Sequence, residues 1–160
     1  MAVDLNEMPD SSRVWVYQAD RPLTNSEINA IDEAAEHFTS QWVAHGKSLV
    51  ATHSIEYSQF LVFAVDESQQ NATGCSIDSS VQFVRDIENK LGVSFLDRSK
   101  IALLEDGEVV LKPLTAIKTS IENGEIKPES KVVNNSVSTL RDWKEMWIQP
   151  AVKSWMKRFF

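Results

Sequence analysis

The stretch Phe60-Leu61-Val62-Phe63-Ala64-Val65 is an unbroken apolar run bounded by Gln59 and Asp66. Side chains along a β-strand point alternately to the two faces of its sheet. A strand can therefore be apolar at every position only where other elements cover both faces. The run predicts the central strand of a sheet that is buried on both sides.

Two strands and a helix are expected before this run. Residues 14–17 are aromatic and β-branched, which favours a strand, and residues 51–57 alternate as half-buried strands do. Between them, Thr24-Asn25-Ser26-Glu27 has the form of a capping box, in which a hydroxyl and a carboxylate satisfy two free amides. The helix that follows carries apolar residues at steps of three and four: Ile28, Ile31, Ala35, Phe38 and Trp42.

A second helix and a hairpin are expected after the run. The helix should end at Gly92, because glycine readily takes the left-handed conformation that closes a helix. Its expected inward positions are Ile77, Ser80, Val81, Val84, Ile87 and Leu91. Residues 101–104 and 109–111 then flank Asp106-Gly107, a pair that favours a tight hairpin turn.

The last third of the chain predicts further small elements. A short helix over residues 115–123 should stop at Gly124, and Val132-Val133 predicts a brief edge strand. A final helix should begin near Ser138 and be kinked or broken at Pro150, which lacks an amide donor. Its apolar positions recur at helical spacing: Leu140, Trp143, Trp147, Ala151, Trp155 and Phe159.

The order strand, helix, strand, strand, helix, strand predicts an α+β fold. The expected core is a ferredoxin-like split βαβ arrangement, a mixed or antiparallel sheet with helices on one face, followed by a C-terminal hairpin and helices. Residues 1–12 hold acidic residues and no apolar run, so a flexible N-terminal lead-in is expected there. Residues 13–160 are expected to form a single α+β domain.

Composition excludes several classes of partner. The formal net charge is −7, from 23 acidic and 16 basic side chains, which disfavours nucleic acid. A single cysteine excludes an intrachain disulfide and cysteine-rich zinc sites. No stretch approaches the roughly 20 apolar residues that span a bilayer, so no membrane insertion is expected. These features indicate a cytoplasmic protein.

The loop after the apolar run, together with the start of the second helix, is the expected location of a ligand pocket. Free amides at a helix N-terminus carry partial positive charge, which can hold an anion or lower a thiol pKa. An unknown small molecule would be bound by residues of this segment: Asp66, Glu67, Gly74, Cys75, Ser76 and Asp78.

Cys75 admits two interpretations. With His45 or His53 as base it could form a nucleophilic pair, which would make the protein a thiol-dependent enzyme. Alternatively, free cysteine behaves as a small buried hydrophobe, and Ser76 or Asp78 simply caps the helix. We expect the packed state. The three histidines are eight residues apart, a spacing that predicts no metal site, and no cofactor is expected.

The tryptophans of the final helix also have two interpretations. Trp143, Trp147 and Trp155 on one stripe favour core packing, or else the seam of a homodimer or another protein partner. Lys153, Lys157 and Arg158 lie beside Trp155 and Phe159-Phe160, although the helix dipole alone favours basic residues at a C-terminus.

The familiar nucleotide and esterase motifs are absent: GxxxxGK[ST], GxGxxG and GxSxG do not occur, and Val81 stands where a phosphatase loop needs arginine. We therefore expect no ATP binding. Four motifs in one order carry a resemblance to a family: residues 14–21 (VWVYQADR), 41–47 (QWVAHGK), 74–78 (GCSID) and 154–159 (SWMKRF). On these, the chain from about Arg13 onward resembles small bacterial proteins that are often labelled "ABC transporter ATPase". The resemblance implies no established reaction, cofactor or catalytic residue.

The leading hypothesis is a non-catalytic or small-ligand-binding cytoplasmic protein with its pocket in residues 66–78. The alternatives are a thiol-dependent enzyme that uses Cys75 and a protein-interaction module that acts through the tryptophan helix.

Overall fold

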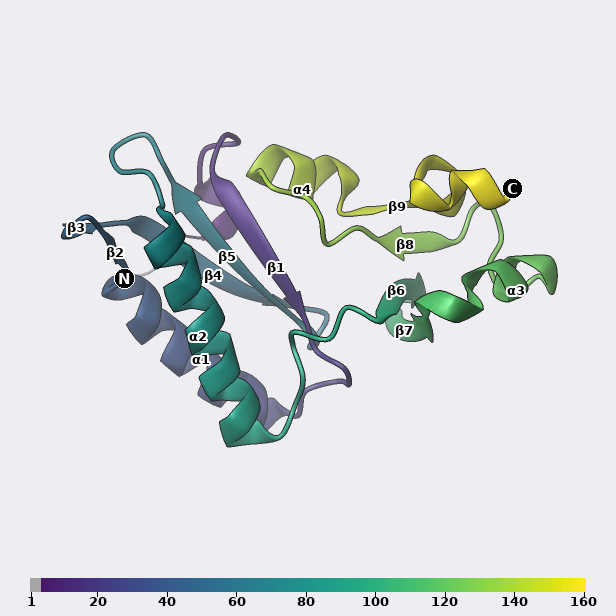
Figure 1. Cartoon of the computed structure of the whole chain (residues 1–160), viewed down its shortest axis with the longest axis horizontal. Coiled ribbons are helices and arrows are strands. Elements are labelled where there is room, and N and C mark those ends of the chain that lie inside the picture. Colours follow the sequence, from purple (N-terminus) through teal and green to yellow (C-terminus); the bar gives the residue numbers. More distant parts are fainter. Residues whose placement is uncertain (1–3) are drawn as a thin grey trace.

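A three-stranded antiparallel sheet contains the apolar run as its central strand. The computed structural model describes residues 4–160. The strand order is β1-β5-β4 (Figure 1), with bounds β1 (Arg13–Gln18), β4 (Val50–Glu56) and β5 (Phe60–Asp66). Every residue from Phe60 to Val65 is buried, which confirms the prediction of a strand covered on both faces.

Two helices cover one face of this sheet. They are α1 (Asn25–Ser40) and α2 (Gly74–Leu91), which lie side by side in Figure 1. Leu61, Phe63 and Val65 form one core with buried residues of both helices. Since β1 and β4 both pair antiparallel with β5, they run in the same direction and are joined through α1, as the split βαβ expectation requires. A small hairpin, β2 (Val43–Ala44) and β3 (Lys47–Ser48), separates α1 from β4.

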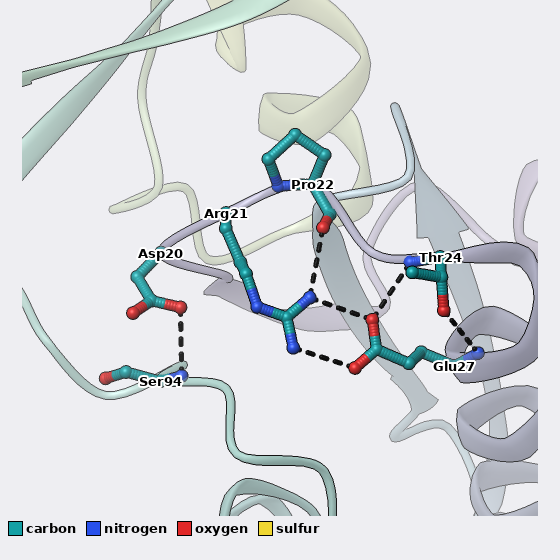
Figure 2. Close-up of polar contacts among 6 residues, drawn as sticks. All are labelled: Asp20, Arg21, Pro22, Thr24, Glu27 and Ser94. Carbon is teal, nitrogen blue, oxygen red and sulfur yellow. Dashed lines mark hydrogen bonds and ion pairs between the residues drawn. The ribbon is translucent and has the colours of Figure 1, made fainter.

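The capping box at the start of α1 forms as predicted (Figure 2). The Glu27 amide donates to Thr24 Oγ1 (3.2 Å), and the Thr24 amide donates to Glu27 Oε1 (3.0 Å). Arg21 adds two hydrogen bonds of 2.8 Å to the same carboxylate. These bonds from Arg21, together with the one from Thr24, lower the pKa of Glu27 to about 2. Nearby, Asp20 accepts the Ser94 amide (3.0 Å) and so connects the chain after β1 to the chain after α2.

A second antiparallel sheet has the order β7-β6-β8-β9. Its strands are β6 (Lys100–Glu105), β7 (Glu108–Pro113), β8 (Lys131–Val133) and β9 (Ile148–Pro150). The predicted hairpin between β6 and β7 is confirmed, because Asp106 and Gly107 have φ values of 52° and 80°. Val132 and Val133, expected on an edge, instead lie between β6 and β9.

The α+β class is confirmed, but the fourth strand of the expected ferredoxin-like core lies in the second sheet. Residues 138–139 occupy part of the space beside β1 that such a strand would fill. The Val14 amide donates to the Ser138 carbonyl (3.0 Å), and Arg13 forms a bridge with Thr139. Strand β6 pairs with β7 and β8 instead.

The second face of β5 packs against the C-terminal half of the chain. Phe60, Val62 and Ala64 share a core with Leu140 and Trp147. The segment before β1 also contributes, through the short 3-10 helix η1 (Leu5–Glu7) and two buried side chains, Leu5 and Met8. The expectation of a flexible lead-in over residues 1–12 missed this packing. Residues 1–3 lie outside the described part of the chain.

The prediction of one long final helix is wrong. In its place are α4 (Leu140–Met146), β9, and two 3-10 helices, η3 (Ala151–Lys153) and η4 (Trp155–Phe159). Pro150 cannot donate the amide hydrogen bond that a helix interior needs, and it stands in β9 opposite Lys131. The short helix before β8 is present as η2 (Leu114–Ala116) and α3 (Ile117–Glu122). Within residues 4–160, no helix is long and apolar enough to cross a membrane.

Candidate functional site

The acidic residues after β5 stabilise their own loop. Asp66 accepts the Ser68 amide (3.0 Å). Glu67 accepts the Ala72 amide (2.7 Å) and lies 3.7 Å from the Arg13 guanidinium. Both carboxylates therefore have local partners that account for their positions.

The first turn of α2 is closed by its own side chains. The Ser76 amide donates to Thr73 Oγ1 (3.2 Å), and the Thr73 amide donates to Ser76 Oγ (2.7 Å), which forms a second capping box. The Trp42 indole donates to the Ser76 carbonyl (2.8 Å) and fixes the end of α1 against this turn. Gly74 makes no close approach, since a Cβ there would meet no atom within 4 Å, and Asp78 is exposed.

Cys75 is exposed, so the expectation of a packed thiol is wrong. The predicted inward residues Ser80, Val84 and Ile87 of α2 are buried, together with Ser76. The other three predicted inward residues are only partly buried: Ile77, Val81 and Leu91. Successive side chains on a helix are about 100° apart, so this phase leaves Cys75 outside the buried stripe.

The two histidines proposed as bases have other positions. His53 Nε2 lies 2.6 Å from Asp32 Oδ1, and the side chain is only 6% exposed. His45 lies in the turn between β2 and β3 with a φ of 51°. Among the described residues, no hydrogen bond joins Cys75 to either histidine.

A groove lies between α1 and α2 and is lined by residues of both helices and of the chain that follows α1. Its volume is about 510 Å³. The Phe38 and Phe83 rings line it and stack across the two helices with centroids 4.9 Å apart. Phe38 also lies 5.0 Å from Trp42. The apolar lining is Ala34, Phe38, Trp42, Val43, Phe83 and Ile87.

Polar side chains form the rim of this groove. They are His37, Gln41, Ser79, Asp86 and Lys90, all exposed. Asp86 accepts a hydrogen bond from Gln82 (2.9 Å), and Lys90 has no ion-pair partner within residues 4–160. The rim can therefore offer both a cation and a carboxylate to a molecule that contacts the aromatic lining.

Sequence reasoning placed the pocket in residues 66–78, and none of Asp66, Glu67, Gly74, Cys75, Ser76 or Asp78 lines this groove. A signal for the groove was present. Ser79, Phe83, Asp86 and Lys90 recur at steps of four, three and four, and form a second stripe on α2 beside its buried one. A large aromatic residue such as Phe83 is not expected on a helix face that contacts only solvent, so this stripe indicates a second contact surface on α2.

The three C-terminal tryptophans do not share one face. Trp143 and Trp147 stack with centroids 5.3 Å apart, and the Trp147 indole donates to Asn135 Oδ1 (3.1 Å). Trp155 lies in η4, and the centroid of its ring is 6.3 Å from that of Phe159. The single helical stripe, expected to pack in the core or else to form a homodimer seam, is absent because the final helix ends before Trp147. Trp147 itself is buried, as the core-packing interpretation expected.

Comparison with known proteins found no matching family model, no matching curated protein and no matching solved structure.

Proposed function

We propose that this protein binds a small, flat, largely apolar molecule in the groove between α1 and α2, without chemically changing it. The observation that carries the proposal is the stacked pair of Phe38 and Phe83, two rings that line the groove and are only partly buried. Partly exposed rings held in fixed positions offer a stacking surface to a ligand ring.

The dimensions of the groove support a small molecule. Its volume of about 510 Å³ lies within the range of roughly 300–1,000 Å³ found for ligand pockets. Such pockets combine an apolar lining with a few polar groups that orient the ligand. Lys90, His37 and Asp86 on the rim would supply that orientation.

A binder is favoured over a thiol enzyme by the placement of the proposed reactive groups. His53 is held by Asp32, and His45 lies in a separate turn, so neither is aligned with Cys75 by a contact among residues 4–160. A cytoplasmic location is part of the proposal. It is supported by the exposed, unpaired thiol, which persists best in a reducing compartment.

Titration with anilinonaphthalene sulfonate, an aromatic sulfonate whose fluorescence rises in apolar sites, tests the proposal. Ser79→Phe adds a ring at the rim of the groove without touching the core. We expect it to weaken probe binding by about tenfold or more, which corresponds to about 1.4 kcal/mol.

Asn89→Phe is the matched control, because Asn89 is an exposed neutral residue of α2 that does not line the groove. This variant should bind the probe as the unmodified protein does. Equal affinities for all three proteins, with unchanged melting temperatures, would place the probe elsewhere and refute the groove as the site.

A further inference from the structure

Exposed apolar and basic side chains gather in residues 151–160, which we call the 151–160 patch. Trp155 and Phe160 are each 44% exposed, and Val152 is 37% exposed. Lys153, Lys157 and Arg158 are exposed among them. In Figure 1 this segment, in yellow, lies at the opposite end of the molecule from α1 and α2, so the patch is separate from the groove.

The backbone beneath the patch is firmly held. Ala151 and Met156 are fully buried in a core with residues of α3 and β8. The Ala151 amide donates to the Ser130 carbonyl (2.8 Å), and Ser154 Oγ accepts the Met156 amide (3.1 Å). The outward side chains are therefore presented from a fixed platform.

The charges of the patch are not neutralised by the protein itself. None of the three cations forms an ion pair within the described residues 4–160, and residues 151–160 contain no acidic side chain. Arg158 lies 4.8 Å from the centroid of the Phe159 ring and so extends the aromatic surface with a guanidinium. On the neighbouring α3 and the loop after it, Glu122 and Glu129 are exposed, while Glu125 is paired with Lys112 (2.8 Å).

We propose that the 151–160 patch docks the protein on an anionic lipid surface. Tryptophan and phenylalanine favour the boundary between headgroups and acyl chains, and nearby lysine and arginine are attracted to anionic headgroups. The patch combines both features. Nucleic acid is a poorer fit, because apolar Val152 adds nothing to phosphate binding.

The overall charge of −7 does not cancel this attraction. At physiological salt, charges are screened over about 8 Å, so the cations nearest the membrane dominate. Each lysine or arginine at an anionic surface contributes about a fivefold gain in partitioning. Docking is peripheral, since no helix within residues 4–160 can cross a bilayer.

Co-sedimentation of the full chain with vesicles tests the proposal. We expect binding to vesicles of phosphatidylcholine mixed equally with phosphatidylserine, and none to phosphatidylcholine alone. Trp155→Ala and the double variant Lys153→Glu/Lys157→Glu should each weaken binding by about tenfold or more. Lys47→Glu/Arg85→Glu makes the same change of net charge on exposed residues of the other half, and should bind within about twofold of the unmodified protein.

Three results would overturn the proposal. The first is equal binding by the patch variants and the unmodified protein. The second is equal loss in the Lys47→Glu/Arg85→Glu control, which would show an effect of bulk charge. The third is absence of vesicle binding, including the case in which a single-stranded DNA oligonucleotide binds through Lys153 and Lys157 instead. Melting temperatures establish that each variant is folded, and the double lysine variant decides the matter if Trp155→Ala unfolds.

Discussion

At the scale of single residues, Glu27 combines an ion pair with a helix cap. Its bonds with Arg21 and Thr24 hold its pKa at about 2, below the ordinary value of 4.5. A carboxyl whose pKa is lower in the folded than in the unfolded chain stabilises the fold above its unfolded pKa. We therefore expect this contribution to be complete above pH 4.5 and to disappear as the pH falls to about 2.

Thermal unfolding of Glu27→Gln over this pH range measures the contribution. The variant should melt below the unmodified protein at pH 7, and the difference should shrink as the solution is acidified. Glu33→Gln makes the same change of charge on an exposed residue of α1 and should show little difference at any pH. A Glu27→Gln difference that is constant with pH would contradict this explanation.

The exposure of Cys75 has a direct chemical consequence. Because the thiol is open to solvent, N-ethylmaleimide should modify it in the folded protein at a rate within about tenfold of the rate in denaturant. Cys75→Ser should abolish the modification and change the free energy of unfolding by less than about 0.5 kcal/mol. Protection of the thiol until the protein unfolds would show instead that it is packed.

At the scale of elements, Trp147 joins the C-terminal half to β5. Its ring meets Phe60 edge-on with centroids 5.2 Å apart, and the side chain is buried. Trp147→Ala should lower the free energy of unfolding by about 3–5 kcal/mol, because it leaves a large cavity.

Trp155→Ala is the internal control for this prediction. Trp155 is 44% exposed, so its replacement should cost much less than that of Trp147, about 1 kcal/mol or less. Denaturant titration followed by far-ultraviolet circular dichroism gives both values. Similar losses for the two variants would mean that the Trp147 contacts contribute little to the fold.

Elements set by local patterns could be predicted from the sequence. The apolar run of β5, the capping box at Thr24 and the Asp106-Gly107 turn each depend on a few neighbouring residues, and all three are confirmed. Of the inward positions expected in α2, Ser80, Val84 and Ile87 are buried, whereas the burial of Ser76 could not be predicted, because a polar side chain carries no apolar signal. The final helix was expected to kink or break at Pro150, but it ends earlier, at Met146, and residues 148–150 form a strand.

At the scale of the whole molecule, the sheet that a strand joins depends on pairing between distant segments, which local sequence patterns do not reveal. Strand β6 has the same local pattern whether it joins β1 or forms a sheet of its own. The choice depends on residues 138–139, which lie far along the chain and take the place beside β1. The groove was missed for a similar reason, because Phe38 and Phe83 are 45 positions apart and meet only once both helices pack on the sheet.

Strand β5 contributes alternate side chains to two cores. Leu61, Phe63 and Val65 belong to one core, and Phe60, Val62 and Ala64 belong to the other. If the chain were divided near residue 99, the first piece would expose the second face of β5 and the other would lose the surface on which it folds. The two halves are thermodynamically interdependent, and we expect the intact chain to melt in one cooperative transition, without a stable half-folded intermediate.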